Sequence, residues 1–136
     1  MPDVNLLFLC TGNSARSQMA EGFARHLAPA GVRVWSAGTQ PSILHPEAVR
    51  AMRERGLDIS SQRSKGLDEV PKDADVVVTL CGDAADRCPA YPGARLREHW
   101  DLPDPARVES GRESAKAFRT VRDDIERRVR DLVSRL

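Results

Sequence analysis

The stretch Val4-Asn5-Leu6-Leu7-Phe8-Leu9-Cys10-Thr11-Gly12-Asn13-Ser14-Ala15-Arg16-Ser17 begins as an apolar run and continues as a polar loop. The apolar run is typical of a β-strand that is buried on both faces of a sheet. Beyond the loop, apolar side chains recur every four residues at Met19, Phe23 and Leu27, which is the spacing of an amphipathic helix. The stretch therefore predicts a buried strand, a tight loop and a helix in direct succession.

The remainder of the chain also alternates between strand and helix patterns. In chain order we predict a strand over 32–38, a helix from Pro46 that stops at Gly56, strands over 74–80 and 94–100, and a helix over 112–136. Strands that alternate with helices form parallel sheets with both faces covered. We therefore predict an α/β fold, a three-layer sandwich with a four-stranded parallel sheet of flavodoxin-like type.

The composition limits the class of protein. A chain of 136 residues and 15.0 kDa has the size of one domain, which we place over residues 1–136. A net charge of +1 argues against a nucleic-acid partner bound through bulk charge. No apolar run approaches the ~20 residues of a membrane span, and the N-terminus lacks the basic region of a signal peptide. We expect a cytoplasmic monomer with no nucleic-acid or membrane partner.

The chain contains three cysteines, Cys10, Cys81 and Cys88, a number that cannot pair off internally. In a reducing compartment this favours reactive or buried thiols over a structural disulfide framework. Cys10 and Cys81 each follow a predicted strand directly. Because ligands of parallel sheets bind beyond the carboxyl ends of strands, we expect both thiols at the functional edge of the sheet.

The loop from Cys10 to Ser17 has the composition of an oxyanion site. A loop that runs into a helix N-terminus presents backbone N–H groups and the positive end of the helix dipole. Gly12 and Asn13 tolerate the positive φ angles that such a loop needs. Arg16 supplies a planar fork for two oxygens of a tetrahedral anion. The full predicted oxyanion-binding set is Thr11, Gly12, Asn13, Ser14, Ala15, Arg16 and Ser17.

Within this loop, Cys10 stands at the entry, where the same field favours the nucleophilic thiolate, and Ser17 is placed to hydrogen-bond it. The alternative is structural: a buried thiol at a strand end, a Gly-Asn turn, and Ser14 as a helix cap. The match of several residue types to separate requirements of an oxyanion site favours the functional interpretation.

The other two thiols, Cys81 and Cys88, are seven residues apart, which is not the spacing of a zinc site. A regular helix would separate their Cα atoms by about 10 Å, whereas a disulfide needs them within ~7 Å. They can bridge only if the segment unwinds or loops out. The alternative is a pair of ordinary buried cysteines.

Asp104 precedes Pro105 in a segment where Pro103 and Pro105 argue against regular structure. An Asp-Pro pair is most often a turn former. Asp104 is also an acid that can protonate a departing oxygen.

With these motifs, the chain resembles the low-molecular-weight tyrosine phosphatases and their relatives, the thioredoxin-coupled arsenate reductases. The resemblance extends from the strand before Cys10 to the C-terminal helix. The run from Asn13 to Glu21 looks especially like the reductases, since the phosphatases usually carry a second loop cysteine where Ala15 stands here. The phosphatases also usually follow the Asp-Pro pair with aromatic residues, whereas Ala106-Arg107-Val108 follow here, which favours a small inorganic substrate.

The resemblance implies an arsenate reductase in which Cys10 is the nucleophile, Arg16 holds the oxyanion and Asp104 is the general acid. It also implies that Cys81 and Cys88 complete a thiol relay that thioredoxin regenerates. No metal or organic cofactor is then required, because thiols carry both electrons. The alternatives are a low-molecular-weight phosphatase that hydrolyses phosphomonoesters through a Cys10 phosphocysteine, and a non-enzymatic oxyanion sensor or adaptor.

Some members of this family bind potassium beside the loop, through residues that match Asn13, Glu21 and Ser36 together with an acid. In this chain Lys65 stands in place of that acid. We therefore predict that the Lys65 ammonium group occupies the position of the cation and that the potassium site is absent. The alternative is a solvated surface lysine.

Overall fold

The computed structural model describes residues 3–80, 91–108 and 111–136. Its four strands form one parallel sheet in the order β2-β1-β3-β4, namely β1 (Val4–Cys10), β2 (Val32–Gly38), β3 (Val76–Thr79) and β4 (Leu96–His99). The helices are α1 (Arg16–Leu27), α2 (Pro46–Arg53) and α4 (Arg112–Ser134), with 3-10 turns η1 (Leu67–Glu69) and η2 (Pro105–Arg107). The predicted fold class is confirmed.

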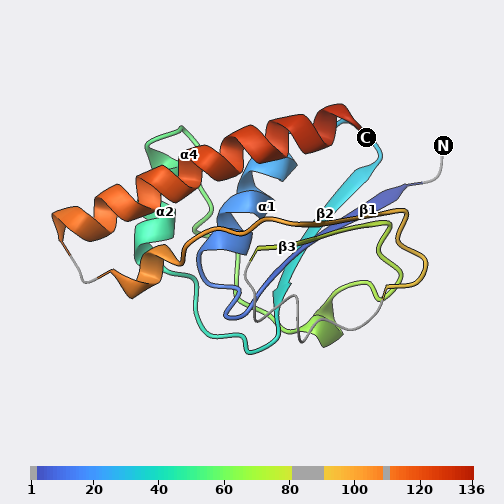
Figure 1. Cartoon of the computed structure of the whole chain (residues 1–136), viewed down its shortest axis with the longest axis horizontal. Helices are drawn as coiled ribbons and strands as arrows, with labels where there is room; N and C mark the ends of the chain where they lie inside the picture. The colour runs from blue at the N-terminus through green and yellow to red at the C-terminus, as the bar shows by residue number, and fades with distance from the viewer. Residues whose placement is uncertain (1–2, 81–90, 109–110) are drawn as a thin grey trace.

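The central strand β1 is buried on both of its faces, as its apolar run predicts. Leu6 and Phe8 belong to the core on the side of the helices, whereas Leu7 and Leu9 belong to a second core on the opposite face. Figure 1 shows α1, α2 and α4 together on one side of the sheet. In the described residues the opposite face is covered by apolar side chains from loops and strand ends, including Val70 and Tyr91.

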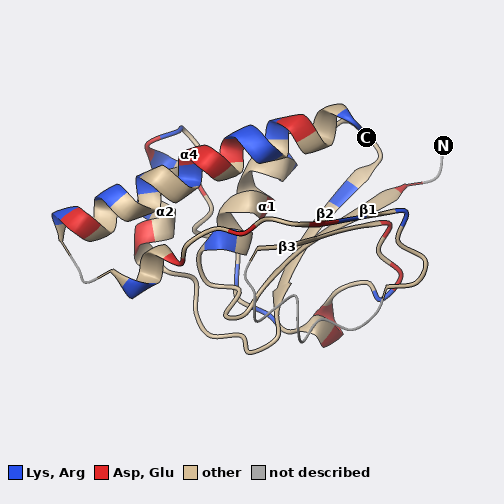
Figure 2. Cartoon of the chain, in the orientation of Figure 1, with Lys and Arg blue, Asp and Glu red and all other residues tan. Residues whose placement is uncertain are grey.

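The long helix α4 packs an apolar stripe on the core and exposes a charged face. Figure 2 shows basic and acidic residues distributed along its length. Arg119 and Arg122 of α4 both bind Glu54 at the end of α2, at 2.7 and 2.8 Å, and these hydrogen bonds lower the pKa of the Glu54 carboxyl to about 2. This ion-pair cluster ties α4 to α2. No helix in the described part of the chain is both long and apolar enough to cross a membrane.

Several element boundaries differ from the sequence-based prediction, among them the ends of α2 and α4, which stop at Arg53 and Ser134. The strands predicted over 74–80 and 94–100 are shorter in the structure, although the Trp100 N–H still donates to the Thr79 carbonyl at 2.7 Å. The segment predicted to lack regular structure contains η2, which begins at Pro105. A proline is accepted there because the first residue of a helical turn needs no hydrogen bond from its N–H group.

The sheet register brings the ends of the strands, and the loop after β1, to one edge. Cys10 pairs with Gly38, and Leu9 pairs with Thr79. Gly38 lies so close to the loop that an added Cβ would be 2.6 Å from the Thr11 carbonyl oxygen and 2.9 Å from the Asn13 nitrogen. The loop therefore requires glycine at this position.

We predict that Gly38→Ala destabilises the protein by about 1–3 kcal/mol, the usual cost of inserting a methyl group into a closely packed interior. Chemical denaturation measures this loss. Gly93→Ala is the matched control, because an added Cβ at Gly93 meets nothing within 4 Å. Equal stability of the two variants would show that the loop does not rest against Gly38.

Candidate active site

A cavity of about 500 Å³ opens at the carboxyl edge of the sheet. The loop after β1 forms one wall of the cavity, and the segment from Leu102 to Arg107 forms another. The loop residues that line it are Cys10, Thr11, Gly12, Ser14, Ala15 and Arg16. The site therefore combines the predicted loop with the predicted Asp-Pro segment, which lies more than 80 residues further along the chain.

Five successive carbonyl groups of the loop, from Cys10 to Ser14, accept hydrogen bonds from groups around it. In loop order the donors are the N–H groups of Thr39 (3.3 Å), Gln40 (2.8 Å) and Ser42 (3.0 Å), the side-chain amide of Gln18 (3.0 Å) and the N–H of His45 (2.9 Å). In a planar trans peptide the carbonyl and the following N–H point in opposite directions. The N–H groups of residues 12–15 are thereby turned away from these donors, and we expect them to face an anion in the cavity.

Asn13 carries the strained backbone of the loop, with a φ of 46°. Gly12 does not take a positive φ, although either residue was expected to tolerate one. The buried Asn13 side chain makes four hydrogen bonds that hold it in place: Oδ1 accepts from the Lys65 N–H and Gln18 Nε2, both at 3.0 Å, and Nδ2 donates to Ser17 Oγ (2.8 Å) and Ser36 Oγ (3.0 Å). These bonds hold Asn13 in the left-handed region, which costs most residues 1–2 kcal/mol or so.

Cys10 is buried, and its Sγ lies 2.8 Å from Ser17 Oγ. In the thiolate form of Cys10 the sulfur carries no proton, so the Ser17 hydroxyl, which accepts from the Asn13 amide, donates its own proton to the sulfur. A Cys10 thiolate is therefore stabilised by a hydrogen bond at the entry of the loop. This is the arrangement that a thiolate nucleophile requires.

Arg16 is anchored on the side of the guanidinium that faces the protein. Its Nη1 donates to the Leu102 carbonyl at 2.9 Å and to the Leu80 carbonyl at 3.4 Å, and its Nη2 lies 3.7 Å from Asp104 Oδ2. Asp104 Oδ1 accepts from the Ala106 N–H at 3.0 Å, so the carboxylate caps η2 while it faces the cavity. The arginine and the acid are thus fixed on the same cavity.

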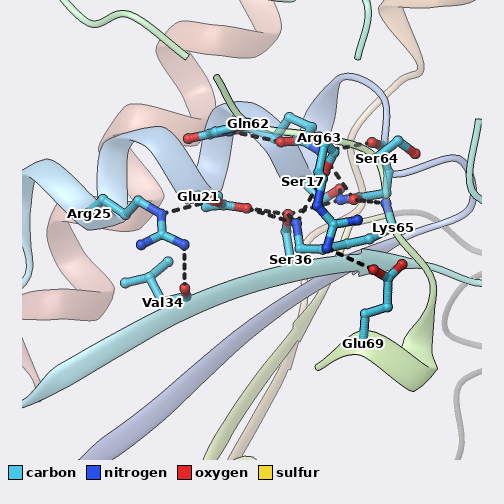
Figure 3. Close-up of polar contacts among 12 residues, drawn as sticks. Ser17, Glu21, Arg25, Val34, Ser36, Gln62, Arg63, Ser64, Lys65 and Glu69 are labelled. Carbon is cyan, nitrogen blue, oxygen red and sulfur yellow. Dashed lines mark hydrogen bonds and ion pairs between the residues drawn. The ribbon is translucent and has the colours of Figure 1, made fainter. Parts of the chain in front are cut away.

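A buried polar network lies behind the loop. Glu21 accepts from Ser36 Oγ at 2.5 Å and from Arg25 Nε at 2.8 Å, and Lys65 Nζ lies 3.5 Å from it (Figure 3). The Lys65 side chain is only 12% exposed, which favours an internal cation over a solvated surface lysine. Among the described residues, no group of three or more His, Cys, Asp or Glu side chains is arranged to hold a metal ion.

The segment 62–65 supports the loop from the same side (Figure 3). Ser64 Oγ donates to the Gly12 carbonyl at 2.8 Å and accepts from the Ser42 N–H at 3.0 Å. Gln62 Nε2 donates to Gln18 Oε1 at 2.8 Å, next to the Gln18 contact with Asn13. Arg63 is held in turn by Glu69 at 2.7 Å, and this hydrogen bond lowers the pKa of the Glu69 carboxyl.

The structure sorts the predicted site residues into three groups. Cys10, Arg16 and Asp104 meet at the cavity, together with Thr11, Gly12, Ser14 and Ala15. The side chains of Asn13 and Ser17 lie behind the loop and shape it. Cys81 and Cys88 lie outside the described residues.

The supporting residues Gln18, Ser42 and Ser64 were not found by sequence reasoning. Their residue types are common in loops and helices; Ser42 and Ser64 stand in no motif, and Gln18 lies within the run 13–21 without a signal of its own. Only the tertiary approach of segments 39–45 and 62–65 to the loop reveals their contribution.

We predict that Ser64→Ala weakens the binding of inorganic phosphate about fivefold, because one hydrogen bond that fixes the Gly12–Asn13 peptide is lost. Titration calorimetry measures the Kd, and the melting temperature is recorded alongside it. Ser61→Ala, at an exposed serine three residues earlier, is the control. Unchanged phosphate affinity in Ser64→Ala would show that the hydroxyl does not position the loop.

The chain is similar to known proteins over nearly its whole length. Residues 5–136 match the family described as low molecular weight phosphotyrosine protein phosphatase. An arsenate reductase of Bacillus subtilis (strain 168) is 50% identical over 128 residues, which cover 93% of this chain and 92% of that protein. An arsenate reductase of Staphylococcus aureus is 43% identical over 126 residues, which cover 92% of each chain.

Two solved structures extend the comparison to the fold. An arsenate reductase in the phosphate binding state has a TM-score of 0.86 and 38% identity, covering 97% of this chain and 98% of that chain. A thioredoxin-dependent arsenate reductase of Corynebacterium glutamicum has a TM-score of 0.75 and 34% identity, covering 96% of this chain and 60% of that chain. The predicted resemblance to arsenate reductases is confirmed, and the chain belongs to the low-molecular-weight phosphotyrosine protein phosphatase family.

Proposed function

We propose that this enzyme reduces arsenate to arsenite through a relay of Cys10, Cys81 and Cys88 that thioredoxin regenerates. The observation that carries the proposal is the placement of Cys10, Arg16 and Asp104 on one cavity, with the carbonyl groups of the loop bonded to donors from the surrounding segments. Arsenate is a tetrahedral oxyanion, and the loop offers donors to several of its oxygens at once.

In the first step, the Cys10 thiolate attacks arsenic and an oxygen leaves as water. Arg16 and the loop N–H groups hold the oxygens that remain, and Asp104 supplies a proton to the departing oxygen. The product is a covalent adduct between Cys10 and arsenic(V). The protein's role in this step is to fix the anion against the sulfur and to deliver the proton.

The next two steps are thiol exchanges. The Cys81 thiolate attacks the Cys10 sulfur, the electron pair of the sulfur–arsenic bond passes to arsenic, and arsenite leaves behind a Cys10–Cys81 disulfide. Cys88 then attacks the Cys81 sulfur, which releases the Cys10 thiolate and leaves a Cys81–Cys88 disulfide. Thioredoxin reduces that disulfide, so two electrons enter for each arsenate reduced.

Support for this order comes from the residue that precedes Cys81. The Leu80 carbonyl accepts from Arg16 Nη1 at 3.4 Å, and the Leu80 N–H donates to the Leu9 carbonyl at 2.9 Å. The chain therefore leaves β3 beside the strand and the arginine that frame Cys10. The relatives named arsenate reductase, one of them thioredoxin-dependent, support the same reaction and the same reductant.

The second candidate function is phosphomonoester hydrolysis through a Cys10 phosphocysteine, which needs neither Cys81 nor Cys88. Membership of the phosphatase family supports it as a side activity. The described cavity lining includes no aromatic side chain to support an aryl leaving group. For this reason we assign the inorganic oxyanion as the principal substrate.

We further propose that the protein acts as a single domain over residues 1–136, as a cytoplasmic monomer without nucleic-acid or membrane partners. Three thiols that cycle between reduced and oxidised states need a reducing compartment, which supports the cytoplasmic placement.

We predict that Cys88→Ser releases arsenite in a single turnover and then stops, because the Cys10–Cys81 disulfide has no resolving thiol. The assay follows arsenate-dependent NADPH consumption with thioredoxin and thioredoxin reductase present, and arsenite is quantified in parallel. Cys10→Ser is the control and releases no arsenite. Sustained thioredoxin-dependent turnover by Cys88→Ser would refute the relay.

We also propose that Lys65 takes the place of a bound cation behind the loop. Its ammonium group lies 3.5 Å from both Glu21 Oε1 and Ser36 Oγ, and its backbone N–H donates to Asn13 Oδ1 at 3.0 Å. An internal ammonium group already balances the buried Glu21 carboxylate, so a second cation would meet like charge.

From this placement we predict that potassium has no specific effect on the wild-type reaction. Rates are compared in potassium and sodium salts at equal ionic strength, in wild type and in Lys65→Met. A strong activation of the wild type by potassium alone would contradict the assignment of Lys65.

A further inference from the structure

Arg107 stands at the mouth of the cavity and takes no part in the reaction described above. It ends η2 and lines the cavity beside Asp104 and Ala106. Its side chain is 83% exposed, and Nε lies 3.8 Å from Asp104 Oδ2. A guanidinium group therefore occupies the cavity wall on the side of the acid.

The simplest interpretation is a surface ion pair between residues three apart. Such an exposed pair contributes little to stability, and a separation of 3.8 Å is too long for a hydrogen bond. Arg16, by contrast, is buried and anchored on the Leu102 carbonyl while it approaches the same Asp104 oxygen at 3.7 Å. Of the two guanidinium groups near Asp104, only that of Arg107 is free to adjust to a ligand.

The geometry of attack on the oxyanion indicates which ligand atom the Arg107 guanidinium can contact. Displacement at a tetrahedral centre proceeds with the attacking and leaving atoms roughly in line. In the proposed reaction Asp104 protonates the leaving oxygen, so that oxygen faces Asp104, and Arg107 lines the cavity beside this acid. In an inorganic oxyanion that oxygen is unsubstituted and accepts a hydrogen bond from a guanidinium group. In a phosphate monoester the same oxygen is bonded to carbon, and its substituent fills the space beside Arg107.

We propose that Arg107 determines specificity by favouring inorganic oxyanions over phosphate monoesters at this site, an inference that rests on the proposed arsenate reduction. The positive charge attracts the fourth oxygen of an inorganic anion, which an ester cannot present in the same form. The guanidinium also stands where an aryl group would need an apolar wall.

The test compares kcat/KM for thioredoxin-coupled arsenate reduction with kcat/KM for p-nitrophenyl phosphate hydrolysis in wild type and Arg107→Gln. We expect kcat/KM for arsenate reduction, divided by kcat/KM for p-nitrophenyl phosphate hydrolysis, to fall about fivefold in the variant. This factor corresponds to the loss of one hydrogen bond at a partly exposed site. Arg53→Gln, an exposed arginine outside the cavity lining, is the control and should keep the wild-type ratio. An equal loss in both reactions, or no loss in either, would overturn the proposal.

A binding measurement keeps the proposal testable without any turnover. Calorimetry gives the affinities of wild type and Arg107→Gln for inorganic phosphate and for phenyl phosphate, and the variant should lose more affinity for the inorganic anion. Equal losses for the two ligands would contradict a role in specificity. If the wild type bound both ligands but did not reduce arsenate, the proposed function would fail while this comparison still decided the role of Arg107.

Discussion

The outward hydrogen bonding of the loop carbonyls is the constraint on which the site depends. A peptide group is planar, so fixing the carbonyls of residues 10–14 on one side fixes the following N–H groups on the other. The donors to these carbonyls come from the segment 39–45 and from the Gln18 side chain. Ser64 adds a second hydrogen bond to the Gly12 carbonyl. The anion site is therefore preorganised by the fold before any ligand enters, which is the condition for effective electrostatic stabilisation.

A series of side-chain hydrogen bonds links the buried Glu21 carboxylate to the Cys10 nucleophile. Glu21 accepts from Ser36, so the Ser36 oxygen is left to accept from Asn13, and Asn13 in turn donates to Ser17. Each donor in this series is fixed by the one before it, and the series ends with the Ser17 hydroxyl beside Cys10 Sγ. The Glu21 carboxylate, which does not line the cavity, thereby helps to orient the Ser17 hydroxyl beside the Cys10 sulfur.

Much of the fold and of the chemistry was predictable, because the signals are local. The run from Val4 to Cys10 predicts a strand buried on both faces, and the loop that follows carries its nucleophile and its arginine within seven residues. The supports of the loop were not predictable, since Ser42 and Ser64 reach it only through tertiary contacts. The placement of Asn13 and Ser17 behind the loop follows from the same contacts, because spacing alone does not say which side chains face the cavity.

The most direct test of the account is a single turnover by the reduced protein without thioredoxin. The protein is mixed with arsenate, arsenite is quantified, and the disulfide that forms is located by peptide mapping. We expect one arsenite per chain and a disulfide between Cys81 and Cys88, with Cys10 returned to the thiol. A protein that bound the oxyanion but released no arsenite, or one whose stable disulfide retained Cys10, would contradict the proposed reaction.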